Sequence, residues 1–375
     1  MGGANYYKNL FHAISAYDAE AKLSITSFVG KKTPPDLIQE CYSNSNIIRS
    51  SIFDRWSPLW LLSKLFSKIV KYDPLLHFVL LRNRIDVVSH STPLVPDSII
   101  KLGWIPDFQH VYLPNFFSDE ELRNRDKDFK SIASNSEIVF LSSCDALSHY
   151  KLFFPPELHQ KARVLRFVSQ IDPLYFDFDE KNLTDVVSRY KIKENFFFIP
   201  NQFWAHKNHK VVLEAANKLK NECVDFCFVF TGNKHDYRNP KLFNDLIDFV
   251  ESNDLTENIF FLGSVPYIDV MALIRFSTAV INPSLFEGWS STVEECKSAG
   301  KEMILSDIPV HREQYPDAVF FNPNNPAELA DVIKQNIVNK NCFKSDQISI
   351  CNENRTKEYF CSYMTVIDSL RNIRK

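Results

Sequence analysis

The chain has 375 residues, of which 45% are hydrophobic and 24% charged, a composition typical of a soluble globular protein long enough for two domains. Its formal net charge of −3 provides no basic face for DNA or RNA, so we expect no nucleic-acid partner. The eight cysteines include no C-x-x-C pair and no secretory leader precedes them, which predicts free thiols in the cytoplasm. No apolar stretch approaches the roughly 18 residues that a membrane span requires.

Short apolar runs, separated by amphipathic segments, follow one another along the chain. Runs that are apolar on both faces and alternate with helices indicate buried parallel strands of an α/β fold. Their number suits two sheets better than one. The expected strands lie within residues 23–30, 85–91, 136–143, 162–168, 195–201, 225–233, 258–263, 278–284 and 302–307.

A helix with two different faces is expected at residues 56–72, WSPLWLLSKLFSKIVKY. Leucine, phenylalanine and isoleucine side chains fall on one face, and three lysines fall largely on another. This pattern suits a helix that lies in a membrane interface. An ordinary amphipathic helix packed on the first sheet produces the same pattern. We therefore expect a cytoplasmic protein, peripheral to the inner face of the plasma membrane if the first interpretation holds.

A domain boundary is expected within residues 169–195, where prolines and acidic residues interrupt the succession of strands before FFFIP resumes it. We divide the chain into residues 1–172, residues 173–350 and a C-terminal helix at 351–375 that closes the fold. Two α/β halves that face each other would leave a cleft between them. Because ligands of parallel sheets bind beyond the carboxyl ends of the strands, both halves would offer loops to that cleft.

The stretch SLFEGWSSTVEECKSAG at 284–300 predicts a short helix after a tight bend. Ser291 and Glu294 match a capping box with Ser291 as the N-cap, so we expect a helix over residues 292–299 that ends at Gly300. Its first backbone N–H groups have no partner within the helix, and the positive end of the helix dipole lies there too. These groups form a seat for phosphate.

Two acidic residues frame this bend, Glu287 before the helix and Glu295 in its first turn. A carboxylate at a helix start can accept two hydrogen bonds from a vicinal diol such as a ribose, which would suit Glu295. Glu287 would then face whatever is attached beyond the phosphates. On spacing alone, the simpler interpretation is a solvated loop acid and an acid that complements the helix dipole. A functional role for these two acids therefore needs support from other segments of the chain.

The motif FEGWSSTVEE resembles the E-x7-E signature of the retaining GT-B glycosyltransferases of family 4, also described as glycosyl transferases group 1. Other segments resemble the same family, most strongly after residue 195, so the resemblance covers nearly the whole chain. They are GGANYYKNLFHAI, IPDFQHVYLPNFFSDEELR, EIVFLSSCDALSHY, FFFIPNQFWAHKNHKVVLEAANKL, FCFVFTGN, IFFLGSVPYIDVMALIRFSTAVINPSLFEG and MILSDIPVHREQYPDAVFFNPNNPAELADVI. The resemblance implies two Rossmann-like parallel-sheet domains facing across a cleft, with the C-terminal helix returning to the first domain.

The resemblance also implies a set of site residues. Lys207 matches the basic residue that binds the diphosphate, Glu295 the acid that holds the ribose, and Glu287 the acid beside the transferred sugar. His110 matches a histidine that contacts the reacting sugar or the acceptor. Taken singly, Lys207 would pass for a surface lysine and His110 for a structural histidine. The catalytic residues would be Glu287, Lys207 and His110, and the donor-binding residues Glu295, Gly288, Trp289, Ser290, Ser291, Thr292, Val293, Gly232, Asn233, Val265, Gln202 and Gly3.

Two departures from the family pattern affect these assignments. Gly2 and Gly3 match the glycine loop that follows the family's first strand, so that strand is missing from the sequence, and we expect a clipped N-terminus. Where the family often has Gly-Arg, this chain has Asn201 and Gln202. One cation for the diphosphate is therefore missing, and Lys207 has to neutralise more of the charge.

The activity implied by the resemblance is transfer of a hexose or deoxyhexose, with retention, from a GDP-mannose-like, dTDP- or UDP-sugar. The acceptor would be a hydroxyl of a glycan or lipid-linked glycan in bacterial surface polysaccharide or lipopolysaccharide synthesis. No metal or other cofactor is expected, because the D-x-D pair Asp177 and Asp179 lies in an acidic linker and His206 and His209 lack further ligands. The alternatives are a non-catalytic nucleotide-sugar-binding protein of the same fold and a nucleotide-sugar epimerase.

Overall fold

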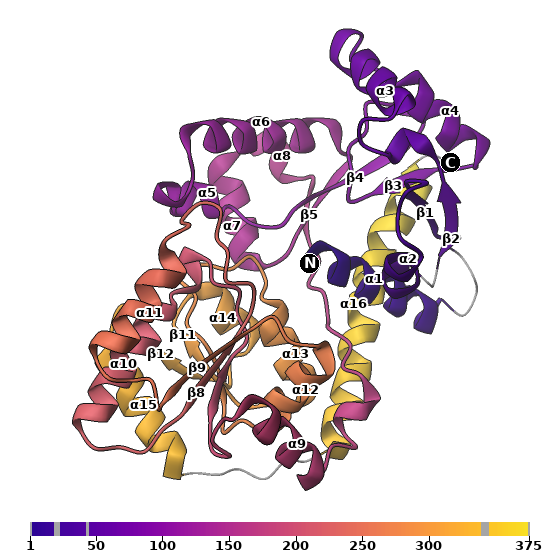
Figure 1. Cartoon of the computed structure of the whole chain (residues 1–375). Coiled ribbons are helices and arrows are strands. Elements are labelled where there is room, and N and C mark those ends of the chain that lie inside the picture. The colour runs from indigo at the N-terminus through magenta and orange to yellow at the C-terminus, as the bar shows by residue number, and fades with distance from the viewer. Residues whose placement is uncertain (1, 19–22, 43–44, 339–344, 374–375) are drawn as a thin grey trace. The chain divides into compact units, whose positions relative to one another are not determined.

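The computed structural model describes residues 2–18, 23–42, 45–338 and 345–373. The chain divides into two compact units, each built on parallel strands flanked by helices (Figure 1). The first unit comprises Met1–Phe108, Glu120–Val168 and Glu353–Lys375, and the second comprises Gln109–Asp119 and Ser169–Asn352. The α/β fold class expected from the sequence is confirmed.

The first unit contains a four-stranded parallel sheet with the order β3-β4-β5-β6 and a separate parallel pair, β1 and β2. Its strands are β1 (Thr26–Val29), β2 (Asn46–Arg49), β3 (Val87–Ser89), β4 (Ile100–Ile105), β5 (Ile138–Leu141) and β6 (Ala162–Val164). Its helices are α1 (Gly2–Tyr17), α2 (Pro35–Tyr42), η1 (Ser51–Phe53), α3 (Pro58–Ile69), α4 (Pro74–Arg82), α6 (Asp119–Asn135), α7 (Cys144–Phe153), α8 (Pro156–His159) and most of α16 (Ser345–Ile373).

A helix begins at Gly2, so the expectation of a glycine loop at Gly2 and Gly3 is wrong. The reason lies in the residues that follow. Tyr6, Leu10, Ala13 and Ile14 are buried and recur at the spacing of one helical face, which anchors α1 in the core of the first unit. The ring of Tyr6 stacks on Trp104 of β4, with 4.8 Å between the ring centroids. Gly3 therefore lies in the first turn of a helix.

The second unit contains a six-stranded parallel sheet with the order β12-β11-β10-β7-β8-β9. Its strands are β7 (Phe197–Ile199), β8 (Phe228–Thr231), β9 (Ile259–Gly263), β10 (Val280–Asn282), β11 (Met303–Ser306) and β12 (Val319–Phe321). Its helices are α5 (Gln109–Tyr112), η2 (Pro114–Phe116), η3 (Pro173–Tyr175), α9 (Glu180–Tyr190), η4 (Ala205–Lys207), α10 (His209–Asn221), α11 (Leu242–Ser252), α12 (Tyr267–Phe276), α13 (Ser291–Ala299), α14 (Pro309–Gln314) and α15 (Pro326–Val338). Numbered within the unit, the strand order is 3-2-1-4-5-6, that of the doubly wound dinucleotide-binding sheets.

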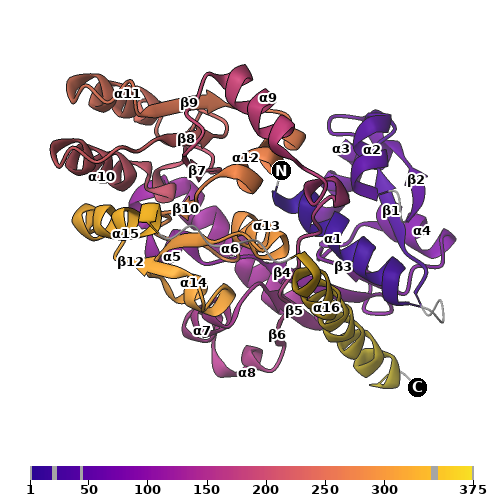
Figure 2. The same ribbon diagram turned by 90° about the horizontal axis from the view of Figure 1, so that it is seen from below.

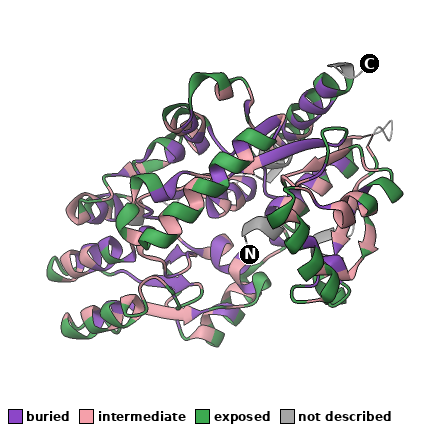
Figure 3. Cartoon of the chain, turned by 90° about the horizontal axis from the view of Figure 1, so that it is seen from above, coloured by how far each residue is buried: buried purple, intermediate pink, exposed green. Residues whose placement is uncertain are grey.

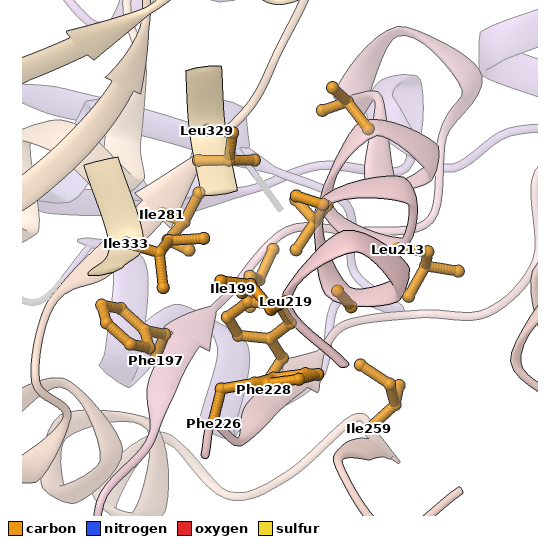
Figure 4. Close-up of a cluster of buried hydrophobic side chains, with 14 of the residues drawn as sticks. Phe197, Ile199, Leu213, Leu219, Phe226, Phe228, Ile259, Ile281, Leu329 and Ile333 are labelled. Atoms are coloured by element: carbon orange, nitrogen blue, oxygen red, sulfur yellow. The ribbon is translucent and has the colours of Figure 1, made fainter. Parts of the chain in front are cut away.

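Two hydrophobic clusters hold the sheet of the second unit between its helices. On one face, strand residues such as Phe197 and Phe228 pack against α10, α11 and α15 (Figure 4). Helix α10 lies between α11 and α15 (Figure 2). On the other face, Phe198 and Val229 pack against α9, α12 and α13. Within each unit, burial is concentrated on the strands and on the inner faces of the helices (Figure 3).

All nine apolar runs contain a strand, and the structure adds three strands that we did not expect, β2, β4 and β12. In β4, Lys101 and Gly103 interrupt the apolar pattern. The Lys101 side chain is nevertheless buried, with its ammonium 2.7 Å from Asp97. A side chain at Gly103 would collide with Ile132 and Ser136, so glycine lets α6 and the residue after it pack closely on the strand. Within the described ranges, no helix combines the length and apolar character needed to cross a membrane.

Candidate active site

The candidate site lies at the carboxyl ends of the strands of the second unit. Because the six strands are parallel, all of their carboxyl ends share one edge of the sheet. The strand order reverses between β7 and β10, which pair at Phe198 and Val280. Ligands of doubly wound sheets bind at this reversal. The loops that follow β7 and β10 carry Lys207 and Glu287.

Lys207 and Glu287 form a buried ion pair, although 80 residues separate them in the sequence. The ammonium of Lys207 lies 2.5 Å from Oε1 of Glu287, and their side chains are only 17% and 9% exposed. The same Oε1 accepts a hydrogen bond from the hydroxyl of Ser284 at 2.6 Å. Burial alone would raise the pKa of Glu287, but the charge of Lys207 and its hydrogen bond to the carboxylate lower it to about 2. Glu287 is therefore ionised at neutral pH.

Asn208 fixes the loop that presents Lys207. Its backbone is left-handed, with φ of 53°, and it ends η4 and begins α10. Its side-chain amide donates hydrogen bonds to the carbonyl oxygens of Pro283, at 3.2 Å, and Pro323, at 2.9 Å. The N–H of Leu285 donates to the carbonyl of His206 at 2.8 Å. The loops after β7, β10 and β12 are thus tied together around the ion pair.

The short helix after the bend forms as expected, but its cap is one residue earlier. Helix α13 spans Ser291–Ala299, its N-cap is Ser290, and it ends at Gly300 with φ of 65°. The capping box predicted for Ser291 and Glu294 is therefore wrong. The buried carboxylate of Glu294 accepts a hydrogen bond from Gln314 of α14 at 3.1 Å, and Gln314 also bonds both backbone groups of Ser290.

The start of α13 keeps the features of a phosphate seat after this correction. Asn282, the last residue of β10, donates a hydrogen bond to the Ser290 hydroxyl at 3.0 Å. The hydroxyl of Thr292 lies 3.4 Å from the carbonyl oxygen of Pro200, after β7. Among the described residues, none accepts a hydrogen bond from the backbone N–H groups of Ser291 and Thr292. These groups point from the positive end of a nine-residue helix.

The other expected donor-binding residues lie at the same edge or next to it. Gln202 follows β7, Gly232 and Asn233 follow β8, and Val265 follows β9. Gly232 has φ of 141°, and a side chain there would come within 2.5 Å of the carbonyl oxygen of Asn201. The N–H of Phe203 donates to the carbonyl of Asn233 at 3.0 Å, so these loops are in direct contact. Gly288, Trp289 and Val293 belong to the bend and to α13.

Glu295 lies on α13, half-buried, one residue beyond the buried Glu294. The pKa of Tyr267, on α12, is raised mainly by burial and further by the negative charge of Glu295. This places the carboxylate towards the loop between β9 and α12, the loop that contains Val265. A role of Glu295 in holding a ribose stays a prediction.

His110 lies in the segment Gln109–Asp119, which clusters with the second unit. Its ring is buried and meets that of Phe117 edge-on, with 6.5 Å between the centroids. In the same segment, Tyr112 stacks on Phe286, with the centroids 6.0 Å apart and the rings 22° from parallel. Because Phe286 immediately precedes Glu287, this segment packs beside the acidic bend. Gly3 belongs to the first unit.

Of the residues considered as alternative metal ligands, Asp179 has a structural role. The carboxylate of Asp179 caps α9 by accepting hydrogen bonds from the N–H groups of Lys181 and Asn182. His206 and His209 are buried, and burial is the main cause that lowers the pKa of each to about 3. In the part of the chain that the structure describes, no group of three or more His, Cys, Asp or Glu residues is arranged to hold a metal ion.

Several residues around the site were not identified from the sequence. Asp236, in the loop after β8, accepts hydrogen bonds from the N–H groups of Ala205 and Arg238. His311 bonds to Ser306 at the end of β11. The only signal available for Asp236 and Arg238 was the position of NKHDYR directly after an expected strand. That signal alone identifies a strand-end turn, because Asp and Asn are common in turns for conformational reasons.

The two α/β units, with the start of α13 at the reversal of the second sheet, define a protein of the GT-B fold. HepE of Anabaena in complex with UDP and glucose covers 99% of this chain and 96% of its own, with a TM-score of 0.65 at 13% identity. A glycosyltransferase from Rickettsia africae covers the same shares, with a TM-score of 0.63 at 15% identity. Sucrose-phosphate synthase from Thermosynechococcus elongatus covers 98% and 92%, with a TM-score of 0.66 at 13% identity. At these identities the likeness shows the fold alone.

Residues 182–350 match the family model described as glycosyl transferases group 1. This segment carries all of the expected site residues apart from Gly3 and His110. The group 1 match and the GT-B neighbours support the expectation of a GT-B glycosyltransferase of group 1 that was drawn from the motif FEGWSSTVEE. The O-antigen chain mannosyltransferase RfbU of Salmonella typhimurium is 26% identical over 161 residues, a match that spans 42% of this chain and 42% of the relative.

Proposed function

We propose that the protein transfers a hexose or deoxyhexose, with retention at the anomeric carbon, from a nucleotide-diphospho-sugar to a hydroxyl of a glycan or lipid-linked glycan. The observation that carries this proposal is the buried pair of Lys207 and Glu287 at the strand-order reversal, beside the start of α13. Mannose is the sugar we favour, because RfbU is described as an O-antigen chain mannosyltransferase. Surface polysaccharide assembly is the corresponding role.

In the proposed mechanism, the main contribution of the chain is to stabilise the departing nucleoside diphosphate. The ammonium of Lys207 and the free N–H groups of Ser291 and Thr292 offset the negative charge that develops as the sugar bond breaks. Glu287 holds the ammonium in place through the ion pair and lies on the side of the transferred sugar. Glu295 holds the ribose hydroxyls. Binding fixes the sugar so that the acceptor hydroxyl attacks from the face that the diphosphate leaves.

This function is tested with the purified 375-residue chain and a panel of GDP, UDP and dTDP. We expect titration calorimetry to detect one preferred nucleotide, and the matching sugar donor to be consumed when a glycan acceptor is supplied. We expect NMR of the product to show the anomeric configuration of the donor, and excess EDTA to leave the rate unchanged. Nucleotide binding without transfer to any acceptor or to water would favour the non-catalytic alternative. Conversion of the donor sugar into its epimer would favour the epimerase.

A second proposal concerns the surface on which transfer takes place. Helices α3 and α4 lie side by side in the first unit (Figure 1). The two helices and the residues that flank α3 expose many large apolar side chains. These are Trp56, Leu59, Leu61, Leu62, Leu65, Phe66, Ile69, Val70, Phe78 and Leu81. Their exposure argues against the interpretation of residues 56–72 as a helix whose apolar face packs on a sheet. Contiguous exposed apolar surface of this kind marks an interaction site.

The charges of this α3–α4 surface favour an anionic lipid bilayer as its partner. Residues 55–84 contain six exposed cations, Arg55, Lys64, Lys68, Lys71, Arg82 and Arg84. The acid within the same range, Asp73, is buried and caps α4 by accepting a hydrogen bond from the N–H of Leu76. Apolar side chains that insert below the headgroups, with lysines and arginines beside them, are typical of interfacial helices. A lipid-linked acceptor would lie in the same membrane.

We expect the chain to co-sediment with vesicles that contain phosphatidylglycerol and to do so weakly with phosphatidylcholine alone. Replacing Leu65 and Ile69 together by serine should lower the bound fraction on anionic vesicles at least about tenfold, because each buried side chain contributes roughly 1.5–3 kcal/mol. The matched control is Leu152→Ser, since Leu152 is 80% exposed on α7, outside this surface. Equal binding of all three proteins, or no binding of the unaltered chain, would contradict the proposal.

A further inference from the structure

Arg238, in the loop between β8 and α11, is a buried cation with an incomplete set of partners. Its side chain is 9% exposed, and its Nε is buried without a hydrogen-bond partner. The nearest carboxylate oxygen, Oδ1 of Asp236, lies 3.7 Å from Nε, beyond hydrogen-bonding distance. Asp236 uses its two oxygens for the backbone N–H groups of Ala205 and of Arg238 itself. Among the described residues, none accepts a hydrogen bond from the guanidinium.

Aromatic rings hold the guanidinium in this position. Its central carbon lies 4.8 Å from the ring centroid of Phe117, 5.0 Å from that of Trp204 and 5.5 Å from that of Tyr237. Cation–π contacts engage the faces of a guanidinium, whereas its N–H groups point outwards in its plane. The rings therefore surround the cation without providing an oxygen or nitrogen acceptor, which leaves its hydrogen-bond donors for another group. Leaving such donors unused in a buried position costs free energy, which a ligand that accepts their hydrogen bonds would recover.

Arg238 is connected to the candidate active site through Trp204. The ring of Trp204 contacts the guanidinium, and its carbonyl accepts a hydrogen bond from the backbone N–H of Lys207 at 2.8 Å. His206, between these two residues in the sequence, has a pKa lowered by burial first, and also by the charges of Lys207 and Arg238. Both cations are therefore close to the same buried ring.

The charges at the site leave room for a second group that binds phosphate. The positive charge of Lys207 is already balanced by the buried carboxylate of Glu287. Arg238 also has a carboxylate within ion-pair distance, since Oδ1 of Asp236 lies 3.7 Å from its Nε, so what Arg238 adds is its unused hydrogen-bond donors. A nucleoside diphosphate carries at least two negative charges on its phosphates, and the N-terminus of a helix contributes only about half a charge. Gln202, at the end of β7, contributes no charge. Arg238 offers a planar set of donors that matches the geometry of phosphate oxygens.

We propose that Arg238 is a diphosphate-binding residue of this chain, whose guanidinium donates hydrogen bonds to the phosphates of the donor next to Lys207. The inference rests on the proposed function, because it takes the nucleotide-diphospho-sugar as the substrate. Phe117 and Trp204 are positioning residues in this arrangement, since they act through the guanidinium.

The test compares Arg238→Gln, Arg238→Lys and the unaltered chain by titration calorimetry with a nucleoside diphosphate, the corresponding nucleoside and inorganic pyrophosphate. We expect Arg238→Gln to weaken binding of the diphosphate and of pyrophosphate about 10- to 100-fold, the effect of one or two hydrogen bonds to a charged group, and to leave nucleoside binding unchanged. The affinity of Arg238→Lys for the diphosphate should lie between those of Arg238→Gln and the unaltered chain, because lysine keeps the charge but loses the planar donors. The control is Arg312→Gln, which removes a charge from an exposed arginine after β11 that is paired with Asp307.

The outcomes separate the inference from the proposed function. Normal diphosphate binding by Arg238→Gln, or equal losses for nucleoside and diphosphate, would overturn the role of Arg238 while leaving the nucleotide site intact. A loss that appears with an alkyl phosphate and not with the diphosphate would assign Arg238 to a phosphate of the acceptor and overturn it as well. If no nucleotide binds but pyrophosphate binds in an Arg238-dependent manner, the result supports an anion site at Arg238 and contradicts the proposal that the donor is a nucleotide sugar. Binding of neither would overturn both.

Discussion

Replacing Lys207 by methionine is expected to lower the rate of sugar transfer about a thousandfold. The ammonium is the charged side-chain group that we assign, together with the start of α13, to the departing diphosphate, and loss of one such preorganised group typically costs about 100- to 1000-fold in rate. The same change leaves the carboxylate of Glu287, only 9% exposed, without its cation. Breaking a buried ion pair on one side destabilises a protein by roughly 3–5 kcal/mol. A loss of activity alone would therefore be ambiguous.

The double variant Lys207→Met/Glu287→Gln separates these two effects. It removes both charges together, and the amide of glutamine can still accept a hydrogen bond from Ser284, so we expect most of the folding stability to return while transfer stays absent. Urea unfolding and initial-rate measurements on the same preparations give both quantities. Lys210→Met is the matched control, because Lys210 lies one turn further on and is 69% exposed. Near-normal transfer by a stable double variant would contradict the assignment of the site.

The positions of the strands were predictable from the sequence because their apolar runs are continuous. Phe197–Ile199 and Phe228–Thr231 are buried on both faces, and such strands carry no polar interruption. Strand β4 was not predicted, because Lys101 and Gly103 interrupt its apolar run. Their compatibility with a buried strand depends on Asp97 and on close packing of α6, which are tertiary contacts. Strand β12 lies at the edge of the sheet, and of its three residues only Phe321 is buried, so it lacks the continuous burial of the central strands.

The cap of α13 shows the limit of local motifs within the site. Ser290 and Ser291 are both good N-caps, and the acid three residues after Ser291 favoured that residue. Gln314, 24 residues from Ser290 in the sequence, decides the outcome by bonding its backbone and the carboxylate of Glu294. The general expectation of a helix start beside Glu287 was unaffected, because either serine begins the helix within one residue.

The partners of the site residues depend on distances that only the fold sets. The sequence predicted that Lys207 and Glu287 share a site, but not that they neutralise each other across 80 residues. This pairing changes the charge available to a ligand and is the reason why Arg238 matters. Arg238 itself is recognisable only through its burial and its three ring contacts. An arginine in a polar loop has no sequence feature that distinguishes it from a solvated one.

The second large effect is expected in the pH dependence of folding stability. Three histidines at the carboxyl edge of the second sheet are buried, and burial is the first cause that lowers the pKa of His206 and His209 to about 3 and of His311 to about 4. In the unfolded chain a histidine has a pKa of about 6.5. Between these values the unfolded chain binds protons that the folded protein does not, so stability falls as the pH falls below about 6.5. With three such groups the loss reaches up to about 4 kcal/mol per pH unit.

Glu287 adds to this loss at lower pH. Its folded pKa of about 2 lies below the ordinary value of 4.5, so its contribution is present above pH 4.5 and disappears as the pH falls towards 2. Urea unfolding at a series of pH values from 7.5 to 5.5 measures mainly the histidine part, to which His90 of the first unit also contributes, because burial lowers its pKa to about 3. The variant His209→Phe should lower the slope by about one proton, because its ring stacks on Phe203 at 4.5 Å and a phenyl group fills the same space.

His235→Asn is the matched control for this measurement, since His235 is exposed in the loop after β8 and should leave the slope unchanged. Stability that stays constant between pH 7 and 5, or a slope that His209→Phe does not alter, would contradict the neutral state of the buried histidines. That state matters for the chemistry, because neutral rings next to Lys207 contribute no charge of their own to the diphosphate. The rate of transfer should accordingly show no histidine titration between pH 6 and 8, with the positive charge supplied by Lys207 and Arg238 throughout that range.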